Sequence, residues 1–197
     1  MRFQLIGVNH KSAPVEIRER LAIPESQLAE ACRKLGEHPE VEEGMIISTC
    51  NRVEVIASTK NGTAADLRGF LHRYFQLAPE ELEKHLYEYR ENEAVRHVFR
   101  VASSLDSMVK GEPQILGQIK NAYSVAAQSK ACGLLLNKLL HRAFHVAKRV
   151  RTETRIGNSA VSVSFVAVEL AKKIFGALEN KTVLLIGAGG RQRPSPA

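Results

Sequence analysis

The hydrophobic pattern of this chain changes near residue 91, and that change constrains the fold more than any other feature of the sequence. Before residue 91, short apolar runs typical of strands alternate with segments of helical spacing. The expected strands and helices lie, in chain order, over residues 3–8, 26–35, 45–48, 53–57, 63–75 and 86–89. Their order, β-α-β-β-α-β, is that of the ferredoxin-like, split βαβ pattern. We therefore predict an α+β fold with this unit at its N-terminal end.

Beyond residue 91 the chain is expected to be helical, with one last strand. Asn92 is a candidate helix cap, and Pro113 suits the first position of a helix. Asn158 or Ser159 can cap the last helix of this half. The expected helices span residues 92–103, 114–129, 134–154 and 158–175, and the strand spans 182–186. These helices follow the split βαβ unit without an internal repeat.

The last strand leads into the glycine-rich segment Gly187-Ala188-Gly189-Gly190. A strand ending in such a turn is typical of the start of a dinucleotide-binding domain. The complete fingerprint also needs a third glycine, a following helix and a distal acidic residue. Residues 191–197 contain two prolines and cannot continue as a long helix. We therefore expect the sequence to hold only the beginning of such a domain.

Charge and cysteine content limit the classes of protein that this sequence fits. A net charge of +7 favours a polyanionic partner, and nucleic acid is the commonest one. Basic residues gather between Lys138 and Arg155, although a solvated helix face would have the same composition. Three widely spaced cysteines favour a reducing compartment, and no apolar run is long enough to span a membrane. We expect a cytoplasmic protein without membrane contact.

The turn between the second and third expected strands carries the first candidate for chemistry, Cys50. A cysteine reacts as its thiolate, which positive charge or oriented donors stabilise. Arg52 supplies a fixed cation, and Thr49 and Asn51 supply hydrogen-bonding side chains. The alternative is a small buried hydrophobic residue at a strand end, the usual fate of a free cysteine. The other two cysteines lack such neighbours, and we expect both to be structural.

A second candidate site is the loop and helix start at residues 106–118. Glycine and proline punctuate this segment, and its polar side chains are suited to a small polar ligand. Backbone N–H groups at the helix start can also bind an anion. A surface loop with a well-chosen helix start would have the same features, so the residues alone leave both readings open.

Several longer segments are more specific than these local patterns. They are Gly-Val-Asn-His-Lys-Ser-Ala-Pro-Val (7–15), Ser-Thr-Cys-Asn-Arg-Val-Glu (48–54), Gly-Glu-Pro-Gln-Ile-Leu-Gly-Gln-Ile-Lys (111–120), Ala-Lys-Arg-Val-Arg-Thr-Glu-Thr (147–154) and residues 157–165. In this order the segments resemble glutamyl-tRNA reductase, and the resemblance extends to about residue 189. It implies a catalytic, glutamyl-tRNA-binding domain over 1–155, the start of a truncated NADP-binding domain over 156–190 and an atypical tail over 191–197.

The resemblance implies an oxidoreductase that converts glutamyl-tRNA to glutamate-1-semialdehyde with NADPH, in the biosynthesis of tetrapyrroles such as haem. The cysteine matching Cys50 takes the glutamyl group as a thioester, which a hydride then reduces. His97 matches a histidine that the family needs for activity. Arg52 is the expected partner of a substrate carboxylate. The expected substrate contacts are Thr49, Asn51, Arg52, Ser107, Glu112, Pro113, Gln114 and Gln118. The incomplete cofactor site comprises Gly187, Ala188 and Gly189.

The resemblance also implies protein partners, and this sequence departs from the family's usual residues at two positions. Full-length members form homodimers, and the downstream glutamate-1-semialdehyde aminomutase is an expected partner. Ser104 stands where the family usually has glycine, and Lys110 stands where it usually has an apolar residue. Since the NADPH site is incomplete, we expect this chain to retain at most acylation of the cysteine and hydrolysis of the ester.

Two other classes of function stay open on sequence grounds. One is a non-catalytic tRNA-binding module, which the charge and the basic helix support. The other is a metal or redox protein that uses Cys50 with His141 and His145. These histidines are four residues apart on a helix, but no third ligand lies nearby in the sequence. We therefore expect no metal site.

Overall fold

The computed structural model of the chain describes residues 2–60, 64–154, 156, 163–176, 178, 181–182 and 184. It has two compact units, Met1–Ala160 and Val161–Ala197. The strands of the first unit are β1 (Arg2–Asn9), β2 (Val41–Ser48), β3 (Arg52–Thr59) and β4 (Tyr87–Arg90). The described part of the second unit contains helix α8 (Val163–Phe175). The predicted functional domains, with limits at residues 155 and 190, stay a prediction.

The strands form one sheet in the order β2-β3-β1-β4, with antiparallel neighbours throughout. β1 pairs with β3 along its whole length, from Arg2 opposite Thr59 to Asn9 opposite Arg52. β4 pairs with the other edge of β1. β2 and β3 form a hairpin, whereas each helical connection joins two parallel strands with a third strand between them. This is the split βαβ arrangement, so the predicted fold class is confirmed.

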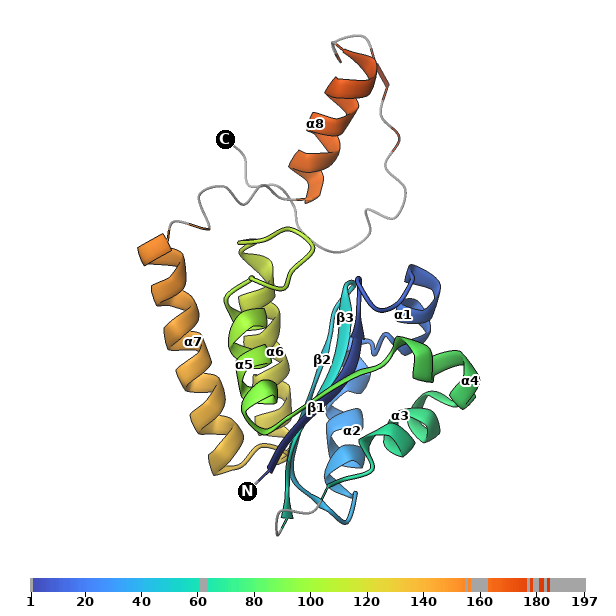
Figure 1. Cartoon of the computed structure of the whole chain (residues 1–197), viewed down its shortest axis with the longest axis vertical. Coiled ribbons are helices and arrows are strands. Elements are labelled where there is room, and N and C mark those ends of the chain that lie inside the picture. The colour runs from blue at the N-terminus through green and yellow to red at the C-terminus, as the bar shows by residue number, and fades with distance from the viewer. Residues whose placement is uncertain are drawn as a thin grey trace. The chain divides into compact units, whose positions relative to one another are not determined.

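Helices cover both faces of this sheet (Figure 1). On one face lie α1 (Val15–Leu21), α2 (Glu25–Gly36), α3 (Leu67–Phe75), α4 (Pro79–Leu82) and the 3-10 turn η2 (Glu83–His85). On the other lie α5 (Glu91–Ala102), α6 (Gln114–Gln128) and α7 (Leu134–Thr154). Every residue of β3 is buried, because this strand is central in the sheet and covered on both sides. No helix within the described residues is long and apolar enough to cross a membrane.

The structure changes several of the expected helix starts. Helix α1 was not predicted, because only Leu21 of its seven residues is buried and its apolar spacing is therefore weak. Helix α3 begins at Leu67, where the Asp66 side chain caps it by accepting the N–H of Gly69 at 2.8 Å. Thr63, at which the predicted helix 63–75 begins, lies outside the described residues. Helix α5 already includes Asn92, so that residue is not its cap.

Helix α7 spans the predicted residues 134–154, but its first turn is anchored by another element. The buried carboxylate of Glu43, at an irregularity in β2, accepts the backbone N–H groups of Leu135 and Leu136 at 2.9 and 2.7 Å. A carboxylate at a helix N-terminus satisfies otherwise unpaired donors and complements the helix dipole. This contact fixes the helical layer to the sheet that carries the candidate site.

Candidate active site

The turn between β2 and β3 presents Cys50 to solvent. The backbone N–H of Thr49 donates to the carbonyl of Arg52 at 2.9 Å, and the N–H of Arg52 donates to Thr49 Oγ1 at 3.1 Å. The same hydroxyl oxygen accepts the N–H of Asn51 at 3.2 Å. These bonds close the turn beneath the cysteine. The alternative that Cys50 is a buried hydrophobic residue is therefore wrong.

Arg18 of α1 is the cation that contacts this turn. Its Nη1 donates to the carbonyl oxygen of Cys50 at 2.6 Å and to Asn51 Oδ1 at 3.2 Å, while its Nε donates to the carbonyl of Ala13 at 3.2 Å. Arg18 was not among the predicted site residues, because α1 was not predicted. The available signal was the charged helical run 16–20, which follows Pro14.

Arg52, the fixed cation that the sequence suggested for the Cys50 thiolate, is buried in the structure. Its side chain points into the interior, and the residue is only 1% exposed. Nη1 donates to Glu54 Oε1 at 2.5 Å, and Nη2 donates to the carbonyl and to Oδ2 of Asp106 at 2.5 and 3.2 Å. Burial opposes its charge, but the neighbouring groups, chiefly Glu54 together with Asp106, jointly outweigh that effect and raise the pKa of Arg52. Both terminal nitrogens are thus already engaged, and contact with a substrate carboxylate stays a prediction.

Glu54 is the centre of a buried polar network that the sequence analysis did not single out. Its Oε1 accepts from Arg52, from His97 Nε2 at 2.7 Å and from the Tyr87 hydroxyl. Burial alone would raise the pKa of Glu54, but Arg52 and the His97 hydrogen bond hold it below its usual value. Its position two residues after Arg52, on the same side of β3, was the signal that could have revealed it.

The ionised state of Glu54 determines how His97 is protonated. A carboxylate only accepts hydrogen bonds, so His97 Nε2 must carry the hydrogen that it shares with Glu54. In a neutral imidazole the acceptor nitrogen is then Nδ1. His97 was predicted as catalytic. In the structure it lines the pocket, and its Nε2 bonds the buried Glu54.

Asp106 joins the end of β1 to the loop before α6. Lys11 Nζ donates to Asp106 Oδ1 at 2.5 Å, while Oδ2 accepts from Arg52 at 3.2 Å and from Asn9 Nδ2 at 3.5 Å. Burial acts to raise the pKa of this carboxyl group, but the hydrogen bonds from Lys11 and Arg52 hold it below the usual range. Both carboxylate oxygens therefore have cationic partners.

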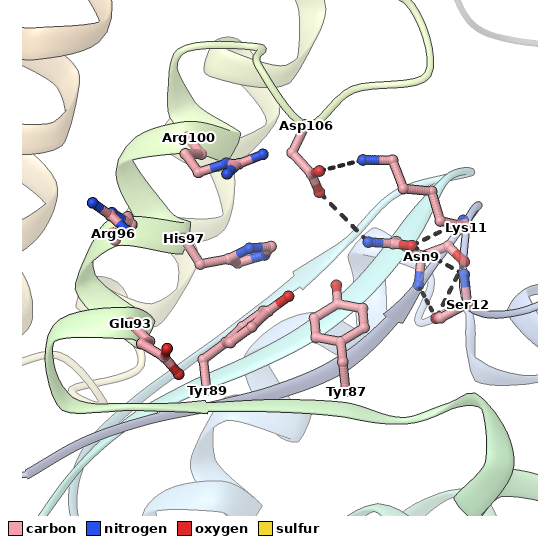
Figure 2. Close-up of a pocket in the computed structure, with 10 residues that line it drawn as sticks. All are labelled: Asn9, Lys11, Ser12, Tyr87, Tyr89, Glu93, Arg96, His97, Arg100 and Asp106. Carbon is pink, nitrogen blue, oxygen red and sulfur yellow. Dashed lines mark hydrogen bonds and ion pairs between the residues drawn. The ribbon is translucent and has the colours of Figure 1, made fainter.

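A pocket of about 470 Å³ lies beside this network (Figure 2). Its walls come from the end of β1, from β4, from α5 and from the loop after α5. The lining residues are Asn9, Lys11, Ser12, Tyr87, Tyr89, Glu93, Arg96, His97, Arg100 and Asp106. Such a volume is typical of sites for small molecules. Of the predicted site residues, His97 lines the pocket directly.

The loop before α6 brings only some of the predicted contacts toward this network. Ser107 follows Asp106 and is buried, and its Oγ has no hydrogen-bond partner in the described structure. Glu112 is half-buried and Pro113 is exposed just before α6. In that helix, Gln114 is exposed and Gln118 half-buried. The hydrogen bonds described for the 49–52 turn reach Asp106 and not these residues, so their contact with substrate stays a prediction.

Ser104 adopts the left-handed conformation, with φ of 59°. This explains why the resemblance leads one to expect glycine here, since only glycine adopts this conformation without strain. The serine hydroxyl compensates by donating to the carbonyl of Glu112 at 2.7 Å, which closes the loop. Lys110, the other departure, is exposed in the same loop.

The remaining chemical candidates lie away from this site or outside the described residues. Cys32 is buried, and burial raises the pKa of its thiol; burial also raises the pKa of Cys132, to about 12. His141 makes ring and hydrogen-bond contacts with Tyr123, and no group of three metal-binding side chains occurs among the described residues. Gly187, Ala188 and Gly189, predicted to bind cofactor, lie outside the described part of the chain, as does the tail 191–197.

Known proteins match this chain over most of its length. The family described as "Glutamyl-tRNAGlu reductase, N-terminal domain" matches residues 6–154. Glutamyl-tRNA reductase 2 of Koribacter versatilis is 61% identical over 189 residues, which is 96% of this chain and 43% of that protein. Glutamyl-tRNA reductase of Trichlorobacter lovleyi is 58% identical over 191 residues, or 96% of this chain and 44% of that protein.

A solved structure agrees with these sequence matches. Glutamyl-tRNA reductase from Methanopyrus kandleri superposes with a TM-score of 0.66 at 36% identity, over 87% of this chain and 39% of that chain. The present chain thus spans less than half of the length of the curated relatives that it matches. The chain belongs to the glutamyl-tRNA reductase family and contains the family's N-terminal domain.

Proposed function

We propose that this chain takes the glutamyl group from glutamyl-tRNA onto Cys50 as a thioester. The observation that carries the proposal is the placement of Cys50 at the exposed tip of a hydrogen-bonded turn, above a buried charged network. Cys32 is buried and Cys132 is half-buried, and burial disfavours the thiolates of both. Cys50 is the exposed thiol of the three, and its fixed turn suits a nucleophile.

The acylation step makes one bond and breaks one. The Cys50 thiolate attacks the ester carbonyl carbon, and a carbon–sulfur bond forms. The carbon–oxygen bond to the terminal ribose of the tRNA then breaks, and the ribose oxygen takes up a proton. His97 is the candidate proton carrier in this step. Glu54 holds its Nε2–H, so the acceptor Nδ1 first takes the proton that the Cys50 thiol loses and then passes it to the ribose oxygen. In this scheme Arg52 and Glu54 position that histidine and the turn.

Reduction of the thioester belongs to the same proposal for the whole protein. When bound, NADPH supplies the hydride for this step. The predicted cofactor residues 187–189 lie outside the described part of the chain. The proposed function is therefore supported by the residues around Cys50 and His97. The homodimer and the aminomutase partner stay predictions that rest on the resemblance.

The outer face of α7 supports a nucleic-acid partner. Lys138, Arg142, His145 and Arg149 are exposed and recur at intervals of four, three and four residues, so they lie along one side of the helix. Arg149 is paired with Glu153 at 2.8 Å, whereas no ion pair within the described residues engages Lys138 or Arg142. Contacts between such charges and phosphates release counterions and make binding weaken as salt rises. This face suits the phosphate backbone of a tRNA. If the chain did not acylate Cys50, the same face would support only the alternative function, a non-catalytic tRNA-binding module.

Cleavage of the aminoacyl ester tests the proposal. The chain is mixed with glutamyl-tRNA, and loss of the ester is compared with spontaneous hydrolysis. We expect Cys50→Ser to abolish the accelerated loss, because a hydroxyl is far less nucleophilic than a thiolate at neutral pH. Cys132→Ser is the matched control and should retain the full rate. Equal ester cleavage by the Cys50→Ser variant would remove Cys50 from the mechanism.

A further inference from the structure

The pocket beside His97 is also lined by two arginines, Arg96 and Arg100, which the acylation chemistry above does not use. Arg96, His97 and Arg100 line it from α5, and Glu93 stands one turn earlier on the same side. Figure 2 shows the Arg100 side chain extending past His97 toward Asp106. The rings of Tyr87 and Tyr89 also line the pocket and pack beside His97, with centroids 5.6 and 4.8 Å from its ring. The pocket therefore combines guanidinium groups with aromatic faces.

Glu93 is the acid on the same side of α5, and among the described residues it forms no ion pair with either arginine. Asp106 is the nearest acid of the loop, but its two oxygens already accept from Lys11, Arg52 and Asn9. Within the described residues, no hydrogen bond or ion pair engages the side chain of Arg96 or Arg100. The two arginines are also one helical turn apart, where like charges destabilise a helix slightly. An anion in the pocket would relieve that repulsion.

The aromatic side of the pocket favours an organic anion over a simple ion. The Tyr89 and His97 ring centroids are 4.8 Å apart, and those of Tyr87 and Tyr89 are 5.5 Å apart. Aromatic faces combined with arginine are typical of sites that hold the bases and phosphates of single-stranded nucleic acid. The same guanidinium fork also binds a carboxylate with two parallel hydrogen bonds.

The pocket adjoins the turn that carries the nucleophile. Asn9 lines the pocket and lies opposite Arg52 in the β1–β3 register. Arg52 follows Cys50 by two residues in the chain. The next residue, His10, donates its backbone N–H to the carbonyl of Asn51 at 2.9 Å. An aminoacyl ester joins the amino acid to the terminal ribose. A substrate at Cys50 therefore brings both the glutamyl carboxylate and the terminal phosphate to this region.

We propose that Arg100, assisted by Arg96, is an anion-binding site that holds the acylated end of the RNA in this pocket. The shared ligand chemistry is an oxyanion, either the side-chain carboxylate of the amino acid or the phosphate of the terminal nucleotide. The proposal rests on the proposed function, since it takes its ligand from glutamyl-tRNA. This role is separate from the predicted contact of Arg52 with a substrate carboxylate; the terminal nitrogens of Arg52 bond Glu54 and Asp106.

Two non-reactive probes separate the sources of the anion. The first is 3′-deoxy-3′-(glutamylamino)adenosine, which has the side-chain carboxylate and no phosphate. The second is the 5′-monophosphate of the corresponding glutaminylamino compound, which has the phosphate and no side-chain carboxylate. Both are titrated calorimetrically into the Cys50→Ser chain, with and without Arg100→Ala. Since no acylation occurs, the outcome is independent of whether Cys50 is the nucleophile.

We expect Arg100→Ala to weaken binding of one probe by about tenfold or more, the loss typical of a hydrogen bond to a charged group. A selective loss for the first probe identifies the carboxylate as ligand, and a selective loss for the second identifies the phosphate. Arg33→Ala, which removes an exposed arginine of α2, is the control and should change neither affinity. Unchanged affinity for both probes in Arg100→Ala, or no binding of either probe to the parent chain, would overturn the proposal.

Discussion

Replacing Glu54 by alanine should destabilise the protein strongly, because it removes the acceptor shared by three buried donors. Glu54 Oε1 accepts from Arg52 at 2.5 Å, from His97 at 2.7 Å and from the Tyr87 hydroxyl. The variant leaves a 1% exposed guanidinium with Asp106 as its remaining partner. Breaking a buried ion pair from one side costs about 3–5 kcal/mol. For a protein of this size, that corresponds to a fall in melting temperature of roughly 6–20 °C.

The measurement is urea unfolding at pH 7, followed by circular dichroism, for the parent chain and three variants. Glu54→Gln keeps the volume and one acceptor oxygen but loses the charge, so its cost should be smaller, about 1–3 kcal/mol. Glu37→Ala removes an exposed carboxylate and should change the free energy of unfolding by less than about 0.5 kcal/mol. A loss below about 1 kcal/mol for Glu54→Ala would refute the view that this network holds the site together.

The difference in the free energy of unfolding between the parent chain and Glu54→Gln should depend on pH, and the lowered pKa of Glu54 fixes the direction of that dependence. The fold lowers the pKa of Glu54, so its ionised form contributes stability at pH values above the ordinary carboxyl pKa of about 4.3. That contribution is lost as the pH falls through the lower pKa of the folded state. The stability gap between the parent chain and Glu54→Gln should therefore hold from about pH 7 to pH 5 and narrow below about pH 4. A gap that widens toward low pH would contradict this sign.

Three further predictions use the same unfolding and cleavage assays. Gly7→Ala should destabilise the fold by about 1–3 kcal/mol or more, because its added Cβ would lie 2.3 Å from the backbone oxygen of Val53; an unchanged midpoint would contradict this close approach. Ser104→Gly should change stability by less than about 1 kcal/mol, since relief of the left-handed strain and loss of the hydrogen bond to Glu112 oppose each other. Arg142→Ala should make the logarithm of the ester-cleavage rate fall less steeply with the logarithm of salt concentration, whereas an identical slope would remove α7 from RNA binding.

The order of the elements could be predicted from the sequence because each strand carries a local apolar signal. β1, β3 and β4 lie within two residues of their predicted limits, and α7 spans its predicted range. β2 begins at Val41, four residues early, since Gly44 and two glutamates interrupt its apolar run. Helix α1 was missed because only one of its residues faces the core.

The candidate site could be predicted only where its residues are adjacent in the chain. Thr49 to Arg52 form one turn, and their proximity follows from the sequence. The contacts of Glu54 with His97 and of Arg52 with Asp106 join positions 43 and 54 residues apart, which no local pattern records. The inward orientation of Arg52 could not be predicted either. The sequence near Cys50 does not indicate that the carboxylates of Glu54 and Asp106 both bind Arg52 in the fold.

The most direct test of the central claim is mass spectrometry of the chain after mixing with glutamyl-tRNA. Acid quenching preserves a thioester, and proteolysis then locates it. We predict that one glutamyl group is added to the peptide containing Cys50, is released by hydroxylamine and is absent in Cys50→Ser. No adduct on the unaltered chain, or an adduct located at Cys132 or at a lysine, would contradict the assignment of Cys50 as the nucleophile.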